Sequence, residues 1–181
     1  MQSQTVGSCA LCQQRRELRD SHLVPKALYR LARAYRQKRP DPVVLTPALH
    51  RQTSLQATQY LLCADCEKRF DKNGEDWVMR HCYRGRDRFR LRDLLQGSIP
   101  IHADENDTIF NASTVSGIDV EKLVYFCVSI FWRASVRSWV SSGQKYEGIS
   151  LGQSIKRKLG GFYSERLVSH GMQQSWYLCL A

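Results

Sequence analysis

Two Cys-x-x-Cys pairs constrain the fold of this 181-residue chain more than any other feature. The first pair is Cys9 and Cys12, and the second, about fifty residues later, is Cys63 and Cys66. Zinc prefers four soft ligands in a tetrahedron, and each pair can present two thiolates to one ion. A shared ion would tie the ends of a long loop together and hold a small lobe in shape. The spacing therefore predicts a structural zinc site of four thiolates.

The same cysteines could instead be redox dithiols or ordinary buried residues. A redox Cys-x-x-Cys normally lies in a strand-to-helix turn of a βαβ pattern, and two copies are not expected. Cys82, Cys127 and Cys179 lack partners at ligand spacing, so they are predicted to lie in the core. The first twenty residues contain no apolar stretch of signal-peptide length, so we expect reduced thiols and a cytoplasmic location.

Positive charge is concentrated in the half of the chain that carries the cysteine pairs. The first hundred residues hold 19 of the 27 Lys and Arg but 10 of the 17 Asp and Glu, so they carry nine of the ten net positive charges. A one-sided basic region of this size suggests a nucleic-acid partner, although a solubilising surface is the simpler alternative.

Within this half, every second residue of 84–92 is arginine: Arg84, Arg86, Arg88, Arg90 and Arg92. A strand would place all five on one face, about 7 Å apart, close to the separation of successive phosphates. The alternative is a partly helical, solvated segment that pairs with nearby acids.

Hydrophobic spacing predicts the elements of this half in outline. Helical periodicity covers 26–38, with basic residues on the opposite face. Three prolines make 39–50 a loop, with a short edge strand at 43–45. A second short strand is expected at 59–62, and a helix should begin near Glu67 and continue into 77–81.

The second half is predicted to be mainly helical. Residues 97–118 should form a connector, and Asp119 is a suitable N-cap for an apolar core helix over 120–140. Arginines interrupt that helix too often for a membrane span. A further helix is expected over 149–159. The fold class is therefore α+β, with a zinc-binding basic lobe at 1–96 and a mainly helical region at 97–181 packing on it.

One histidine follows the first cysteine pair in a distinctive context. His22 stands in Ser-His-Leu-Val-Pro-Lys, and the second pair stands in Leu-Leu-Cys-Ala-Asp-Cys-Glu. On these motifs, residues 9–72 resemble the HNH endonuclease superfamily, the ββα-metal nucleases of treble-clef type, in its four-cysteine form. The chain is more similar still to uncharacterised bacterial HNH-like proteins that also carry an apolar helix like Phe-Trp-Arg-Ala-Ser at 131–135. The resemblance implies a ββα-metal fold for the lobe.

The resemblance also implies hydrolysis of a phosphodiester, in which a neutral histidine takes a proton from water while a divalent cation stabilises the phosphate. His22 matches the general base. Directly after the second cysteine pair the family often has His or Asn; this chain has Glu67, whose oxygens could bind a hard cation such as Mg²⁺ or Mn²⁺. It could equally be a first-turn acid favoured by the helix dipole. The family commonly has Asp or His before the general base, but this chain has Ser21, a poor ligand, with Asp20 one position earlier, where a bulge could bring it in.

Three functions follow from these features, none of them at a membrane. The first is a metal-dependent HNH-like endonuclease acting on DNA rather than RNA, in a bacterial phage-defence setting that rests on the resemblance alone. Lys26 and the five alternating arginines would hold its nucleic acid. The second is a catalytically inactive module that binds nucleic acid on the same scaffold, which Ser21 favours. The third is an adaptor whose helical region docks a protein partner or a second copy through aromatic side chains: Tyr125, Phe126, Phe131, Trp132 and Trp139.

Overall fold

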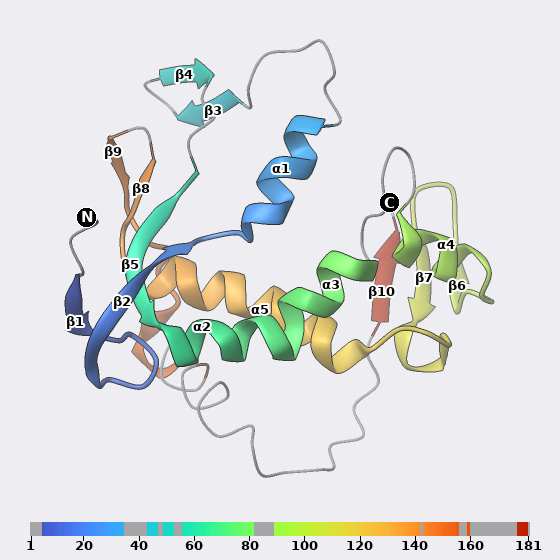
Figure 1. Cartoon of the computed structure of the whole chain (residues 1–181). Coiled ribbons are helices and arrows are strands. Elements are labelled where there is room, and N and C mark those ends of the chain that lie inside the picture. Colours follow the sequence, from blue (N-terminus) through green and yellow to red (C-terminus); the bar gives the residue numbers. More distant parts are fainter. Residues whose placement is uncertain are drawn as a thin grey trace. The chain divides into compact units, whose positions relative to one another are not determined.

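Helices and strands are mixed along the chain (Figure 1), as a computed structural model shows. The described residues are 5–34, 43–46, 49–52, 56–81, 89–141, 143–155, 159 and 177–180. Two units are formed: Met1–Asp71 with Val128–Leu167, and Lys72–Cys127 with Val168–Ala181. Each unit combines early and late segments, whereas the sequence suggested a boundary at residue 96. The difference arises because one continuous helix, α5 (Val120–Val136), contributes residues to both units.

A five-stranded sheet forms the centre of the first unit (Figure 1). Its strands, in spatial order, are β1 (Val6–Ser8), β2 (Arg15–His22), β5 (Thr58–Cys63), β8 (Trp139–Ser141) and β9 (Gln144–Tyr146). All neighbouring strands are antiparallel. The strand predicted at 59–62 is confirmed as β5, but the other four strands were not predicted.

The pairing of β2 with β5 contains an irregularity that decides which side chains are buried. Arg19 pairs with Leu62 and Asp20 pairs with Tyr60, so the register passes over Leu61. Leu61 and Leu62 are both fully buried, as expected where two residues of a bulged strand oppose one residue of its partner. The extra residue therefore lies in β5 and not in β2, and Asp20 stays exposed.

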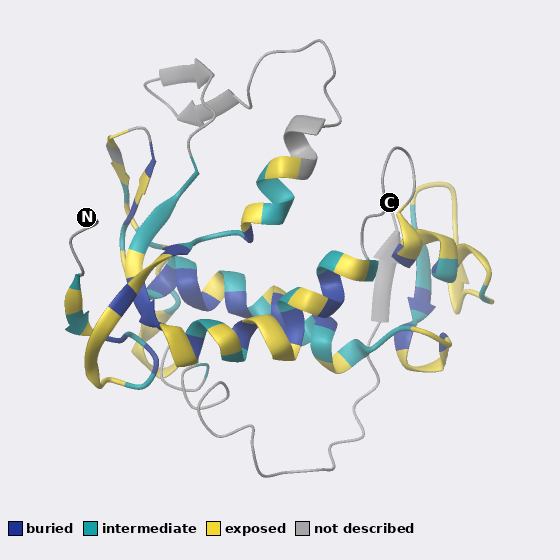
Figure 2. Cartoon of the chain, in the orientation of Figure 1, coloured by how far each residue is buried: buried dark blue, intermediate teal, exposed yellow. Residues whose placement is uncertain are grey.

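The helix α2 (Ala64–Phe70) follows β5 directly, with Cys63 as its N-cap. Phe70 stacks on Trp132 of α5 with ring centroids 5.6 Å apart, and the Arg133 guanidinium lies 4.7 Å from the centroid of the Phe70 ring. The indole N–H of Trp139 donates to the Arg133 carbonyl at 3.1 Å. All four side chains are buried. Figure 2 shows buried segments, in dark blue, along α5. This core holds α2, and with it the second cysteine pair, against the late part of α5.

Other elements of the first unit match the predictions in part. The helix α1 (Lys26–Ala34) begins where expected, and 35–38 lie outside the described residues. The strand β3 (Val43–Thr46) confirms the one predicted at 43–45, but it pairs with β4 (Leu49–Gln52), which begins inside the predicted loop. Of the helix expected over 149–159, residues 152–155 are helical.

The second unit contains strands that were predicted to be a connector. Its sheet has the order β10 (Tyr177–Leu180), β7 (Thr108–Asn111) and β6 (His102–Ala103), with the short helix η2 (Ala112–Thr114) after β7. The connector prediction for 97–118 is therefore wrong, and the region 97–181, predicted to be mainly helical, also contains the strands β6 to β10. Pairing of β7 with β10, far along the chain, could not be recognised from the local sequence.

The helices of the second unit include two that continue α2. A π-helix, η1 (Asp71–Glu75), leads into α3 (Asp76–His81), so the predicted helix exists with an irregular middle turn. Gly74 lies so close to α5 that a Cβ there would be 3.0 Å from the Phe126 nitrogen, which explains the glycine. The helix α4 (Arg90–Gln96) completes the set.

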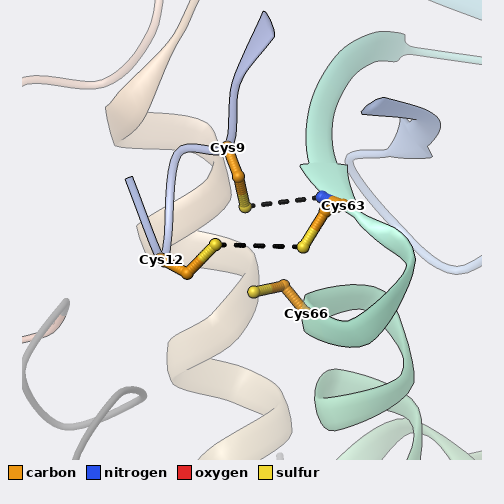
Figure 3. A group of neighbouring side chains, drawn as sticks. All are labelled: Cys9, Cys12, Cys63 and Cys66. Atoms are coloured by element: carbon orange, nitrogen blue, oxygen red, sulfur yellow. Dashed lines mark hydrogen bonds between the residues drawn. The ribbon is translucent and has the colours of Figure 1, made fainter. Parts of the chain in front are cut away.

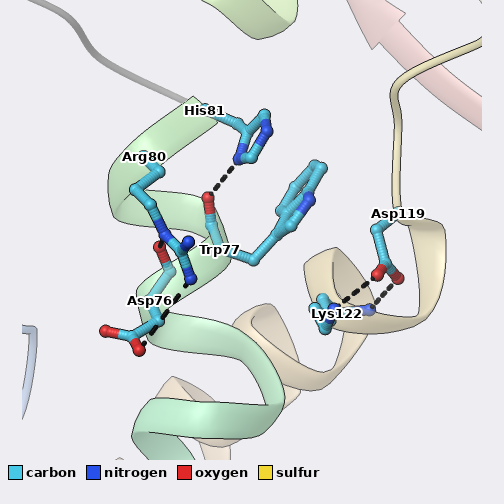
Figure 4. A network of polar contacts seen from close by, with 6 residues as sticks. All are labelled: Asp76, Trp77, Arg80, His81, Asp119 and Lys122. Atoms are coloured by element: carbon cyan, nitrogen blue, oxygen red, sulfur yellow. Dashed lines mark hydrogen bonds and ion pairs between the residues drawn. The ribbon is translucent and has the colours of Figure 1, made fainter.

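The predicted N-cap of the core helix is confirmed (Figure 4). Asp119 Oδ1 accepts from the Lys122 amide at 3.0 Å, and its Oδ2 pairs with the Lys122 ammonium at 2.9 Å. The helix begins at Val120 as expected but ends at Val136, because Trp139 already belongs to β8. In α3, also drawn in Figure 4, the His81 ring stacks on Trp77 at 4.5 Å between centroids.

The aromatic side chains proposed as a docking face lie mostly inside the protein. Tyr125, Phe126, Trp132 and Trp139 are buried, and Phe131 is the exposed member of the set, at 57%. These five residues therefore do not form the surface that the adaptor hypothesis requires. Among the described residues, the helices are too short or too polar to cross a membrane.

Candidate functional site

The four cysteines of the two pairs meet at one place (Figure 3). Cys9 and Cys12 lie in the loop between β1 and β2, Cys63 ends β5, and Cys66 lies in the first turn of α2. All four sulfurs lie within 4.8 Å of one another, and Cys12 Sγ is 3.9 Å from Cys63 Sγ. A tetrahedral zinc with bonds of about 2.3 Å would hold its sulfurs about 3.8 Å apart. The cluster could hold a metal ion, and its geometry is consistent with structural zinc.

Backbone hydrogen bonds give the first cysteine loop its shape. The Gln13 amide donates to the Cys9 carbonyl at 2.9 Å, and Gln13 has a positive φ of 60° that lets the chain turn back. The Ala10 amide donates to the Leu61 carbonyl at 3.0 Å and so attaches the loop to β5. The Cys63 amide donates to Cys9 Sγ at 3.4 Å. These bonds place the first cysteine pair against the second.

The protonation of the thiols fits a cluster that needs a cation. Burial and the neighbouring thiols of Cys63 and Cys9 raise the pKa of Cys66, and burial raises the pKa of Cys12. Burial also opposes ionisation of Cys9, but backbone amides, that of Cys63 first, outweigh it and lower the pKa to about 7. Ionising all four thiols together, three of them buried, requires a compensating positive charge, which a bound metal ion would supply.

Ser21, the residue before the predicted general base, is in direct contact with Glu67, the predicted cation ligand. Ser21, next to His22 at the end of β2, donates a hydrogen bond from Oγ to Glu67 Oε1 in α2. Ser21 is 3% exposed, and its Oγ also accepts from the Leu62 amide at 3.3 Å. The contact places the end of β2 beside the helix that carries Cys66. Asp20, the alternative ligand considered from the sequence, is exposed.

His22 lies half-buried at the end of β2, opposite Thr58 of β5. Its ring is 6.5 Å from that of Tyr29, measured between centroids, and the two planes are tilted by 57°. The Tyr29 hydroxyl accepts from the Ala57 amide at 3.3 Å, which holds α1 near β5. Among the residues that the structure describes, none makes a hydrogen bond with the His22 ring.

The predicted nucleic-acid contacts are only partly placed. Arg84, Arg86 and Arg88 lie outside the described residues. Arg90 and Arg92 are exposed but lie in α4, so the strand interpretation is wrong at these two positions. Leu91 and Leu95, one helical turn apart, are buried there, and this spacing explains the helix. Lys26 is exposed at the start of α1.

The cysteines outside the two pairs were predicted to be core residues. Cys127 is exposed, so that prediction is wrong for it, because on α5 it points about 160° away from buried Tyr125 and Ser129, each two residues from it. Cys82 lies outside the described residues, and Cys179 belongs to β10.

Two features near the site, one contact and one exposed side chain, were not foreseen. Arg16 of β2 pairs with Asp65 of α2 at 2.5 Å, on the surface beside the cysteines. Arg30 is exposed one turn after Lys26 on α1. The four-residue spacing of Lys26 and Arg30 on a predicted helix was the signal for the second feature. The ion pair of Arg16 with Asp65 depends on the pairing of β2 with β5, so no local sequence pattern indicated it.

Comparison with known proteins gives no match to a family model, to a curated protein or to a solved structure. The geometry of the site must therefore support any function by itself.

Proposed function

We propose that this chain is a zinc-stabilised, metal-dependent nuclease of the HNH type, which hydrolyses phosphodiester bonds of DNA with His22 as general base. In this proposal the four cysteines hold structural zinc, and β2, β5 and α2 form the ββα-metal motif. The contact between Ser21 and Glu67 is the observation that carries it. It brings the strand end with the candidate base beside a helix carboxylate, next to the four-cysteine cluster.

The proposed division of labour follows from the chemistry of each group. A neutral His22 accepts a proton from the attacking water, for which its ring nitrogens are free of hydrogen bonds to described residues. Glu67 offers carboxylate oxygens, the ligand type that Mg²⁺ and Mn²⁺ prefer. Such a cation, when bound, stabilises negative charge on the phosphate and the leaving oxygen. The four-cysteine cluster joins the first cysteine loop to α2, the helix that carries Glu67.

A second candidate function is a nucleic-acid-binding module without catalysis. Ser21 favours it, since this position carries a hydroxyl committed to Glu67 where the resemblance leads one to expect a metal ligand. The two functions share the zinc scaffold and the basic surface, and they differ only in whether the bound backbone is cut.

Plasmid nicking separates the two functions. We expect the zinc-loaded chain to nick supercoiled DNA with Mg²⁺, Mn²⁺ or Ni²⁺, and Glu67→Gln to reduce the rate about a hundredfold by weakening the cation site. Glu121→Gln is the matched control, because Glu121 is an exposed first-turn acid of another helix, α5. Salt-sensitive DNA binding without nicking under any of these metals would favour the inactive module instead.

We infer that α1 provides the main basic contact with nucleic acid. Lys26 and Arg30 are exposed one turn apart, and no acidic side chain in the described parts of the chain pairs with either. The first turn of α1 contains no acid, and the helix begins four residues after His22. By contrast, Arg92 of α4 forms an ion pair with Asp93, with its Nε 4.0 Å from Asp93 Oδ1.

Replacing both α1 cations tests this inference. The double variant Lys26→Ala/Arg30→Ala removes two phosphate contacts, so the slope of log affinity against log salt should become shallower by about 2. Arg90→Ala/Arg92→Ala on α4 removes the same charge and should leave the slope near that of the parent. If the α4 pair changes the slope and the α1 pair does not, the assignment to α1 is wrong. Fluorescence anisotropy over a range of salt concentrations measures both.

A further inference from the structure

Ser21 links a backbone amide to the carboxylate of Glu67. Its hydroxyl accepts from the Leu62 N–H at 3.3 Å and donates to Glu67 Oε1. The Arg19 carbonyl, at 3.4 Å, is a more distant second acceptor. Because a serine hydroxyl has one hydrogen, the bond from Leu62 helps to orient that hydrogen toward the carboxylate. At 3% exposure, Ser21 is shielded from water that would compete for these bonds.

This arrangement leaves one oxygen of Glu67 available. Oε1 is engaged by Ser21, and within the described residues no other hydrogen bond or ion pair involves this carboxylate. Glu67 is half-buried, and its Oε2, which has no partner among the described residues, is not a fully buried atom, so a ligand from solvent can reach it. The side chain is therefore held at one oxygen and open at the other.

We propose that Ser21 is a positioning residue that orients Glu67 to bind a divalent cation through Oε2; this inference rests on the proposed function. Ser21 then occupies the place before the candidate base without binding the cation itself. Ordering a glutamate side chain costs conformational entropy, and a side chain ordered in advance does not incur that cost when it binds. Partners that orient a metal ligand in this way typically contribute 10–100-fold to metal affinity.

Titration of the zinc-loaded chain with Mn²⁺, followed by electron paramagnetic resonance, tests the proposal without requiring catalysis. We expect Ser21→Ala to weaken Mn²⁺ binding at least about tenfold, and Ser21→Thr, which keeps the hydroxyl, to restore most of the affinity. Ser135→Ala is the matched control. Ser135 is also buried, and its Oγ donates to the Trp132 carbonyl at 2.8 Å, away from Glu67. That variant loses a buried hydroxyl but should bind Mn²⁺ like the parent.

Equal Mn²⁺ affinity in Ser21→Ala and the parent would overturn the proposal. Equal Mn²⁺ affinity in Glu67→Gln and the parent would also overturn it. If Ser21→Ala does not fold, Ser21→Cys has a similar shape with a weaker donor and must also weaken binding. Nicking is then scored separately. A parent that binds Mn²⁺ through Glu67 but does not nick refutes the nuclease and leaves the positioning role standing. A parent that nicks while Ser21→Ala binds Mn²⁺ normally refutes only the positioning role.

Discussion

Cys66→Ser is expected to release the zinc and to unfold the first unit. Cys66 is 1% exposed in the first turn of α2, and its sulfur joins three others from the first loop and the end of β5. Structural zinc sites contribute about 10–16 kcal/mol of apparent binding free energy. This is comparable with the whole stability of a domain, which is about 5–15 kcal/mol. A serine oxygen is a much poorer ligand for zinc than a thiolate, so most of this contribution should disappear.

Zinc content per chain and thermal melting by circular dichroism measure the effect. Cys127→Ser is the control, because it makes the same chemical change at an exposed cysteine outside the cluster. We expect Cys127→Ser to keep the metal content and melting temperature of the parent. If Cys66→Ser melts at the same temperature as Cys127→Ser, the cluster contributes little to stability.

His22→Ala is expected to lower the nicking rate about 10²–10⁴-fold, the usual contribution of a general base. Zinc content and DNA affinity should change little. His22 does not belong to the four-cysteine cluster, and its ring makes no hydrogen bond to a described residue. The reduction should therefore appear in the rate at saturating DNA and not in the binding curve.

His102→Ala provides the comparison for this measurement. His102 is exposed in β6, with its Nε2 3.0 Å from Asp104 Oδ2, and it belongs to the other unit. We expect this variant to nick at the parental rate. Parental activity in His22→Ala would exclude His22 as the base, and an equal loss in both variants would indicate a general effect on the protein.

The features that could be predicted from the sequence are those with a local signal. The spacing within each Cys-x-x-Cys pair defines two ligand turns wherever the pairs lie in the fold, and the structure brings their sulfurs together. Asp119 was recognisable as an N-cap because a short acid directly precedes a long apolar run. The strand β5 is apolar over Leu61 and Leu62 and is bounded by the second cysteine pair.

The strand β2 could not be predicted, and the reason is physical. It contains five charged residues, and only Leu18 and Ser21 are buried, so it lacks the alternation of a half-buried strand. It exists because β1 and β5 pair with its two edges, and those pairings are non-local. The contact of Ser21 with Glu67 depends on the same pairing. In 84–92 the alternation of arginine suggested a strand, but the apolar pair Leu91 and Leu95 determined a helix at its end.

The strand order of the first unit has a consequence for the nascent chain. All four cysteines have emerged from the ribosome once residue 66 has left it, so the four-cysteine cluster and the pairing of β2 with β5 can form early. The outer edge of β5, however, gains its partner only when β8, at Trp139–Ser141, has been made. Until then an unpaired strand edge is available to other chains, which is a recognised route to aggregation during synthesis. Early binding of a metal ion by the cysteines would thus stabilise the edge of β5 that pairs with β2. The opposite edge of β5 stays unpaired until β8 has been made.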